Sequence, residues 1–174
     1  VIRGAGKAFC SGGDIGAFKE AEDTAALIDA EAGVLHESIK LIRTMEAIVI
    51  AAIEGVAVGA GVGLALASDL SVATKNTIMN MGYRRIGLTP DGGGSFFLSR
   101  MIGAKRFNEM YLFSGNITMD QAKELGLINF VCEEGSLDEE NIAWVERLRE
   151  AGCRLILWEP FELICTPANL ELVL

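Results

Sequence analysis

The chain has 174 residues, of which 51% are hydrophobic and 20 are glycine, and its formal net charge is −9. This length suffices for one domain with a core, and the glycine-rich composition favours an α/β domain with tight strand-to-helix turns. The acidic balance argues against a nucleic-acid partner, and no apolar run reaches the ~18 residues of a membrane span. The four cysteines lack metal-ligand spacing and there is one histidine, so we expect no metal site and a reducing, cytoplasmic location.

The chain begins with Val1 and Ile2, which have the character of a strand end running into the turn Arg3–Gly6. Because the sequence starts at the end of a strand, we expect that the first strands of the fold are missing from it. The next segment, Lys7–Ile15, reads KAFCSGGDI and places an apolar anchor, Phe9, before a pair of glycines. We therefore expect a tight turn here, directly after a strand.

An amphipathic helix is the clearest pattern in the chain. Asp23 and Thr24 can cap its start, and apolar residues then recur at spacings of four and three. These residues are Ile28, Ala32, Leu35, Ile39 and Ile42. His36 lies beside this stripe, and a lone histidine at such a position favours a structural role over a catalytic one.

The segment Ile50–Leu70 (IAAIEGVAVGAGVGLALASDL) is the one around which the chain is organised. The apolar run Ile48–Ile53 predicts a buried strand, and a glycine-rich turn leads from it into a small-residue helix that ends at Ser68. Backbone N–H groups at such a helix start can hold an anion or a developing oxyanion. A dinucleotide turn is disfavoured, because Leu64 stands where G-x-G-x-x-G needs a small residue. Simple close packing of the helix on a sheet remains open.

Two short strands and a helix are expected after this segment. The strands are Leu70–Ala73 and Thr77–Met81. Pro90 then forces a turn, Asp91 can cap a helix, and that helix runs from the glycines that follow to Met101.

The last recognisable helix covers Met119–Leu125. Thr118 and Gln121 form a capping box at its start, and Gly126 supplies its end. Residues 131–140 turn acidic and exposed, and from Ile142 the helical periodicity loosens. The sequence thus predicts a core domain over residues 1–140 and a tail of uncertain structure over residues 141–174.

Two glycine turns, Gly12–Gly13 and Gly59–Gly61, each follow a strand. In a parallel sheet both would open at the carboxyl edge, where ligands bind. Two N–H groups converging on one oxygen form an oxyanion hole, worth about 3–4 kcal/mol per donor in acyl chemistry. The chain has no G-x-S-x-G motif and no histidine paired with a serine or cysteine, so an enolate is the natural charge to stabilise. Enolate chemistry also needs a carboxylate or a similar base.

Three segments, in this order and spacing, resemble the crotonase family of enoyl-CoA hydratases and isomerases. They are Lys7–Ile15 (KAFCSGGDI), Ile53–Asp69 (IEGVAVGAGVGLALASD) and Ile86–Arg100 (IGLTPDGGGSFFLSR), extended by Asn116–Ile128 (NITMDQAKELGLI). The resemblance implies an α/β fold built as a ββα spiral, here without its N-terminal strands and with an atypical C-terminal tail. It also implies an acyl-CoA partner and a homotrimer or hexamer, with no separate cofactor because coenzyme A is part of the substrate.

The resemblance also assigns roles to single residues. The N–H groups of Gly13 and Ala60 would form the oxyanion hole, since a backbone donor survives the replacement of glycine by alanine. The residues expected along the coenzyme A are Ser11, Asp14, Ile15 and, as a phosphate contact, Lys7. For Lys7 a solvated turn charge is an equally good interpretation.

The acid/base positions decide the reaction. Hydratases of the family use two glutamates, and these positions hold Gly63 and Tyr83 here. Asp91, however, stands where dienoyl-CoA isomerases, aryl-CoA dehalogenases and ring-enoyl isomerases of the family carry a working aspartate. Helix capping is the alternative for Asp91, and orienting the acyl chain or simple packing are the alternatives for Tyr83.

These expectations favour an enzyme that isomerises the double bond of an enoyl-CoA through a thioester enolate. A hydratase or another crotonase-type reaction remains an alternative. So does a non-catalytic family member that only binds acyl-CoA. A nucleotide-binding domain is the remaining, weaker hypothesis.

Overall fold

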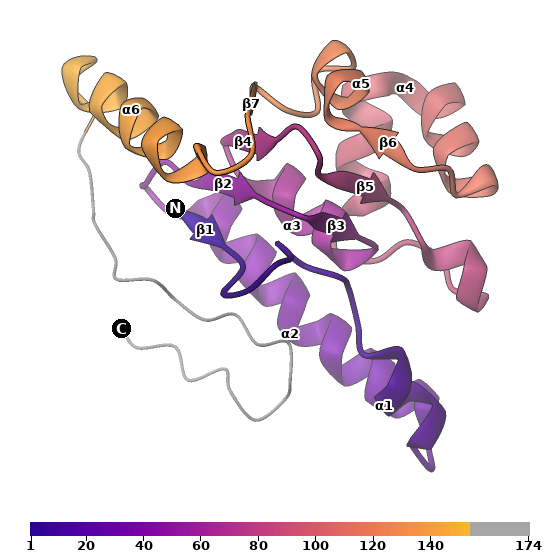
Figure 1. Cartoon of the computed structure of the whole chain (residues 1–174). Helices are drawn as coiled ribbons and strands as arrows, with labels where there is room; N and C mark the ends of the chain where they lie inside the picture. The colour runs from indigo at the N-terminus through magenta and orange to yellow at the C-terminus, as the bar shows by residue number, and fades with distance from the viewer. Residues whose placement is uncertain (154–174) are drawn as a thin grey trace.

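The computed structural model describes residues 1–153, and their strands form two sheets (Figure 1). The first is parallel, in the order β1–β2–β4–β7, and consists of Ile2–Arg3, Ile50–Ile53, Leu70–Thr74 and Phe130–Cys132. The second, in the order β3–β5–β6, consists of Val56–Val58, Ile78–Asn80 and Ile117–Thr118. Its β3–β5 pair is parallel and its β5–β6 pair is antiparallel.

The helices surround these sheets. They are α1 (Ile15–Glu20), α2 (Thr24–Thr44), α3 (Ala60–Ala67), the 3₁₀ turn η1 (Tyr83–Ile86), α4 (Gly94–Phe113), α5 (Met119–Glu124) and α6 (Leu137–Glu150). Figure 1 shows α2 passing below both sheets, with α1 at its far end and α6 on the other side of the first sheet. No helix within residues 1–153 is long and apolar enough to cross a bilayer.

Two successive ββα units are visible in this order. In β2–β3–α3 and in β4–β5–η1–α4, the first strand joins one sheet and the second strand joins the other. Like strands of the two units pair in parallel, β2 with β4 and β3 with β5. The ββα spiral that the resemblance implied is therefore present.

The first sheet is buried on both faces, which explains why β2 reads as a continuous apolar run. Successive side chains of a strand point to opposite faces. Accordingly Ile50 and Ala52 pack toward α6, with Trp144 among their neighbours, whereas Ala51 and Ile53 belong to the main core with α3. This main core positions the start of α3 at the end of β3.

Several predicted boundaries agree with the structure. Asp23 caps α2 by accepting from the Ala26 N–H, and the capping box at the start of α5 is formed by both of its side chains. The helix expected to end at Met101 does break close to that residue, at Gly103, where φ is 78° and ψ is 159°. A second helical stretch, which the sequence analysis did not predict, follows to Phe113, and both carry the label α4.

The sequence analysis missed the short elements α1, η1, β6 and β7, and two further elements that bear on the site and on the domain boundary. The strand β3 lies inside the segment predicted as a turn, and α6 runs through the boundary placed between residues 140 and 141. The first part of the predicted tail is therefore helical, and its Trp144 packs on the first sheet. The rest of that tail, residues 154–174, lies outside the described residues.

Candidate functional site

The two glycine turns predicted to meet do lie side by side, because Cys10 pairs with β3. The Cys10 N–H donates to the Val56 carbonyl at 3.1 Å, and the Val58 N–H donates to the Cys10 carbonyl at 2.9 Å. Because this bridge is parallel, the segment after Cys10 and the segment after β3 run in the same direction. A methyl group placed on Gly12 would lie 3.7 Å from the Ala60 nitrogen.

Close packing, the other interpretation of the central glycines, holds at Gly61. A methyl group at Gly61 would lie 2.4 Å from the Cys10 carbonyl oxygen, so no side chain fits there without moving backbone. Ala60, one residue earlier, has room for its methyl group and remains a backbone donor. Close packing at Gly61 therefore leaves the N–H of Ala60 available as a donor.

The two expected oxyanion donors, Gly13 and Ala60, both line one cavity of about 620 Å³. Ala60 is the first residue of α3, so its N–H has no acceptor within the helix, and the positive end of the helix dipole faces the same place. Within residues 1–153 neither N–H donates a hydrogen bond. Two backbone donors without an acceptor among the described residues therefore lie at the wall of this cavity.

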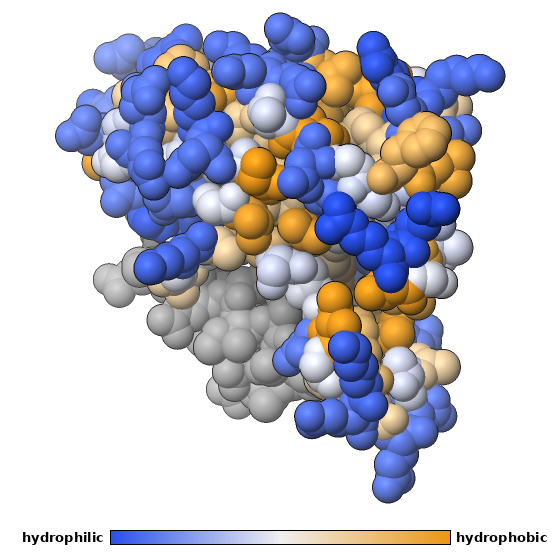
Figure 2. Space-filling view, turned by 45° about the vertical axis from the view of Figure 1, so that its right-hand side comes forward, coloured by the Kyte–Doolittle hydropathy of each residue, from blue (hydrophilic) through white to orange (hydrophobic). Residues whose placement is uncertain are grey.

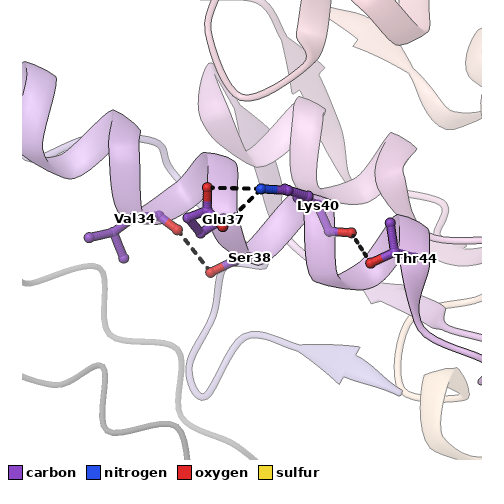
Figure 3. Close-up of polar contacts among 5 residues, drawn as sticks. All are labelled: Val34, Glu37, Ser38, Lys40 and Thr44. Carbon is purple, nitrogen blue, oxygen red and sulfur yellow. Dashed lines mark hydrogen bonds and ion pairs between the residues drawn. The ribbon is translucent and has the colours of Figure 1, made fainter.

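The rest of the cavity wall is mostly apolar. Its apolar lining includes Phe18, Ile28, Val34, Leu35, Leu64 and Leu88. Figure 2 shows apolar side chains gathered in the middle of this face, above the projecting end formed by α1 and the start of α2. Ser38 also lines the cavity, but its hydroxyl donates to the Val34 carbonyl of the preceding turn at 3.1 Å (Figure 3). The α2 wall is thus suited to an acyl chain.

The Asp91 carboxylate is held by Tyr83 at the edge of this cavity. The Tyr83 hydroxyl donates to Asp91 Oδ1 at 2.6 Å, and both residues line the cavity. Burial, followed by the bond to Asp91, raises the pKa of the Tyr83 hydroxyl far above its ordinary value. Tyr83 therefore remains a proton donor to this carboxylate across the accessible pH range.

Helix capping, the alternative for Asp91, is wrong. The cap of α4 is Gly93, with φ at 74°, and no side chain caps that helix. Asp91 contributes only its backbone carbonyl, which accepts from the Gly94 N–H at 2.9 Å. Its carboxylate accepts from the Tyr83 hydroxyl instead, and the residue lines the cavity.

The residue after Asp91 is clamped between two helices. The Gly92 N–H donates to His36 Nε2 of α2 at 3.0 Å. On the other side, a methyl group at Gly63 of α3 would lie 1.9 Å from the Gly92 carbonyl oxygen. The loop therefore occupies the space that a side chain at position 63 would need. The sequence suggested a structural role for His36 but could not identify this partner.

The expected coenzyme A contacts divide into two groups. Ser11 and Ile15 line the cavity. Asp14 and Lys7 do not: the Asp14 carboxylate caps α1 by accepting from the Gly16 and Ala17 N–H groups at 2.8 and 3.1 Å, and Lys7 is an exposed turn residue. The structure thus gives Asp14 a local structural task.

Glu31 is a cavity residue that the sequence analysis missed. It lines the cavity from α2, and a methyl group on Gly13 would lie 3.5 Å from its Oε2. Partial burial, and then the nearby Asp14, raise the pKa of the Glu31 carboxyl. Its position three residues after Ile28, on the cavity side of α2, was the only signal in the sequence.

Comparison with known proteins supports the resemblance. A family model described as "Enoyl-CoA hydratase/isomerase" matches residues 1–156. A probable enoyl-CoA hydratase of Rhodobacter capsulatus is 37% identical over 131 residues, covering 74% of this chain and 49% of that protein. The 1,2-epoxyphenylacetyl-CoA isomerase of Escherichia coli is 32% identical over 140 residues, covering 79% and 53% respectively. The chain spans about half the length of the curated relatives it matches.

Solved structures show the same fold. The crystal structure of an enoyl-CoA hydratase from Polaromonas sp. JS666 superposes with a TM-score of 0.78 at 37% identity, covering 84% of this chain and 57% of that one. A putative enoyl-CoA hydratase from Thermobifida fusca, solved in complex with CoA, gives a TM-score of 0.76 at 28% identity, covering 85% and 60%. Both the sequence match and the spiral of ββα units lead to one conclusion: the chain belongs to the enoyl-CoA hydratase/isomerase family, as its crotonase-like segments indicated.

Proposed function

We propose that the chain binds an enoyl-CoA thioester and moves its double bond, with Asp91 as the acid/base. The thioester carbonyl would accept from the Gly13 and Ala60 N–H groups. Preorganised donors of this kind stabilise the negative charge that develops on the oxygen when a proton leaves the acyl chain. The apolar wall from α2 would hold the chain itself.

In the proposed reaction Asp91 removes a proton from C2 of a 3-enoyl chain. The electron pair enters the thioester, the dienolate forms, and the proton returns from Asp91 to C4, so that the double bond lies between C2 and C3. One carboxylate can carry out both transfers, because the proton that it takes is the proton that it returns. No water or second reactant is consumed.

The observation that carries this proposal concerns position 63 and the loop that contains Asp91. Position 63 has no side chain, and the backbone of this loop fills the space beside it. The Gly92 carbonyl fills the space beside Gly63, so α3 has no room for an acidic side chain. The carboxylate comes instead from Asp91, which Tyr83 holds by a 2.6 Å hydrogen bond. A site with the donors retained and the carboxylate moved in this way suits proton shuttling.

Hydration is the second candidate, and Glu31 favours it. This carboxyl lines the same cavity, and partial burial, followed by the nearby Asp14, raises its pKa, which is the direction that suits a general acid. Together with Asp91 it would supply the two acid/base groups that activation of water requires. The names of several relatives, such as the probable hydratase of Rhodobacter capsulatus, also favour this candidate.

The deciding experiment follows deuterium from solvent into an enoyl-CoA, with product analysis by mass spectrometry. Isomerisation by a carboxylate that returns the same proton predicts a shifted double bond with little deuterium in the product, and hydration predicts a 3-hydroxyacyl product with deuterium at C2. Asp91→Asn keeps the size of the side chain and should abolish the reaction, whereas Asp120→Asn, on the exposed first turn of α5, should leave it unchanged. Binding of the thioester without either product would identify a non-catalytic acyl-CoA binder.

We also propose that the chain assembles as a homotrimer or hexamer. The helix α4 exposes several large apolar side chains, of which Phe113 is 78% exposed and Phe96 is 51% exposed. These two side chains lie on opposite sides of the kink at Gly103. Large exposed apolar areas are typical of a surface that another protein covers. Light scattering at micromolar concentration tests this proposal, and a monomer would contradict it.

A further inference from the structure

The peptide unit between Asp91 and Gly92 is held at both of its ends. At the nitrogen end, the Gly92 N–H donates to His36 Nε2 at 3.0 Å. At the oxygen end, the Asp91 carbonyl accepts from the Gly94 N–H at 2.9 Å, and the Tyr83 hydroxyl lies 3.4 Å away. His36 is therefore the side chain that fixes the nitrogen end of the residue pair carrying the proposed acid/base.

This hydrogen bond requires one particular form of the imidazole. A backbone N–H can only donate, so Nε2 of His36 must carry a lone pair and the ring proton must be on Nδ1. An imidazolium ion has N–H groups at both nitrogens and cannot accept. Protonation of His36 would therefore replace this hydrogen bond by two N–H groups facing each other.

The loop has little freedom to absorb such a change. Gly92 has a φ of 53°, and a methyl group on it would lie 2.8 Å from Leu35 Cδ2 of α2. Its carbonyl already abuts Gly63, where an added methyl group would lie 1.9 Å away. A rotation of this peptide unit moves Asp91 directly, because Asp91 is its other half.

We propose that His36 is a positioning residue for Asp91: its neutral imidazole fixes the Asp91–Gly92 peptide, and its protonation releases that peptide and lowers turnover. The proposal rests on the proposed role of Asp91. The proposal adds that turnover falls in acid because His36, a side chain outside the substrate cavity, becomes protonated.

The charged groups around His36 are few and mostly paired. The surface groove that contains His36 also contains Lys40 and Arg43 of α2 and Asp69 beyond α3. Arg43 donates to Asp69 at 3.0 Å, and Lys40 lies 3.5 Å from Glu37 (Figure 3). The side chains that α4 contributes to this groove, Phe96, Phe97 and Met101, are uncharged, and Asp91 lines the other cavity and not this groove.

Two substitutions separate the hydrogen bond from the titration. His36→Gln supplies an amide oxygen that can accept from Gly92 but does not titrate, whereas His36→Leu fills space without an acceptor. We expect kcat of the parent to fall on the acid side, because a protonated His36 can no longer accept from the Gly92 N–H. His36→Gln should keep kcat near the parent value at neutral pH, and its kcat should not show this fall in acid. His36→Leu should lower kcat by roughly 10- to 100-fold at every pH, with KM little changed.

A second readout does not depend on turnover. Because His36 is the only histidine of the chain, its ring signals in NMR spectra are unambiguous. The Gly92 amide signal of the parent should shift with the same midpoint as the His36 ring, and should not shift over that range in His36→Gln. A Gly92 amide that ignores the titration of His36, or an unchanged fall of kcat in acid in His36→Gln, would overturn the proposal. If instead Asp91→Asn retained full activity while the Gly92 amide followed His36, the fault would lie with the proposed function.

Discussion

The carbonyl oxygen of Gly92 lies so close to Gly63 that a methyl group at position 63 would approach it to 1.9 Å. This contact joins two motifs of the sequence, the start of α3 and the loop before α4. It explains why a buried helix tolerates a glycine at its centre, although glycine costs about 1 kcal/mol relative to alanine in a helix. The glycine makes room for the loop that carries Asp91.

Gly63→Ala is therefore expected to destabilise the protein, contrary to the usual effect of this substitution in helices. The added methyl group must displace the Gly92 backbone, and overpacking of this kind costs about 1–3 kcal/mol. Urea denaturation measures the change. Gly33→Ala on α2 is the matched control, because a methyl group there meets nothing within 4 Å. A Gly63→Ala protein as stable as Gly33→Ala would contradict the close contact.

Tyr83→Phe should impair proton transfer without unfolding the protein. The substitution keeps the buried ring and removes the hydroxyl that donates to Asp91 Oδ1 at 2.6 Å. Hydrogen bonds to charged groups contribute about 1.5–3 kcal/mol, so we expect kcat to fall roughly 10- to 100-fold. Tyr111→Phe is the control, since its hydroxyl donates to the Leu88 carbonyl instead. Equal kcat values for the two variants would remove Tyr83 from the mechanism.

Glu31→Gln should raise stability at neutral pH and leave it unchanged in acid. The fold raises the pKa of Glu31, chiefly by burial and then through Asp14, so the folded chain holds this proton more tightly than the unfolded chain does. The protonated form therefore favours folding at low pH. That contribution is lost as the pH rises from the unfolded pKa through the raised folded pKa.

Glutamine remains neutral throughout, so thermal unfolding curves of the parent and of Glu31→Gln should separate only above this range. Glu20→Gln, at the exposed end of α1, serves as the control and should show no such separation. A constant difference between parent and Glu31→Gln at every pH would show that charge is not the cause.

Local signals in the sequence were sufficient for the capped helices and the two glycine turns. The Asp23 cap and the box formed by Thr118 and Gln121 depend on residues three positions apart. The strand β3 was missed because its three residues, Val56–Val58, are too few to show a period of two. The helix α6 was missed because charged residues separate the apolar side chains that it packs on the sheet.

The contacts of the site could not be predicted in the same way. His36 and Gly92 are 56 residues apart, and their hydrogen bond exists only because α2 packs beside the start of α3. Tyr83 and Asp91 are eight residues apart, but a left-handed glycine and a 3₁₀ turn decide how they face each other. In both pairs the course of the backbone in three dimensions, rather than the spacing of residue types along the sequence, determines which groups form the hydrogen bond.

Ala60→Pro tests the oxyanion hole itself. Proline lacks the N–H and is tolerated as the first residue of a helix, which is the place that Ala60 occupies in α3. Loss of one donor to a developing oxyanion lowers turnover by about 10²–10³-fold. Ala60→Ser keeps the N–H and adds one atom, so it should retain most of the activity. Circular dichroism would confirm the fold of both variants, and calorimetry with an acyl-CoA would separate binding from turnover. A folded Ala60→Pro protein that turns over at the parent rate would show that this N–H does not receive the thioester oxygen.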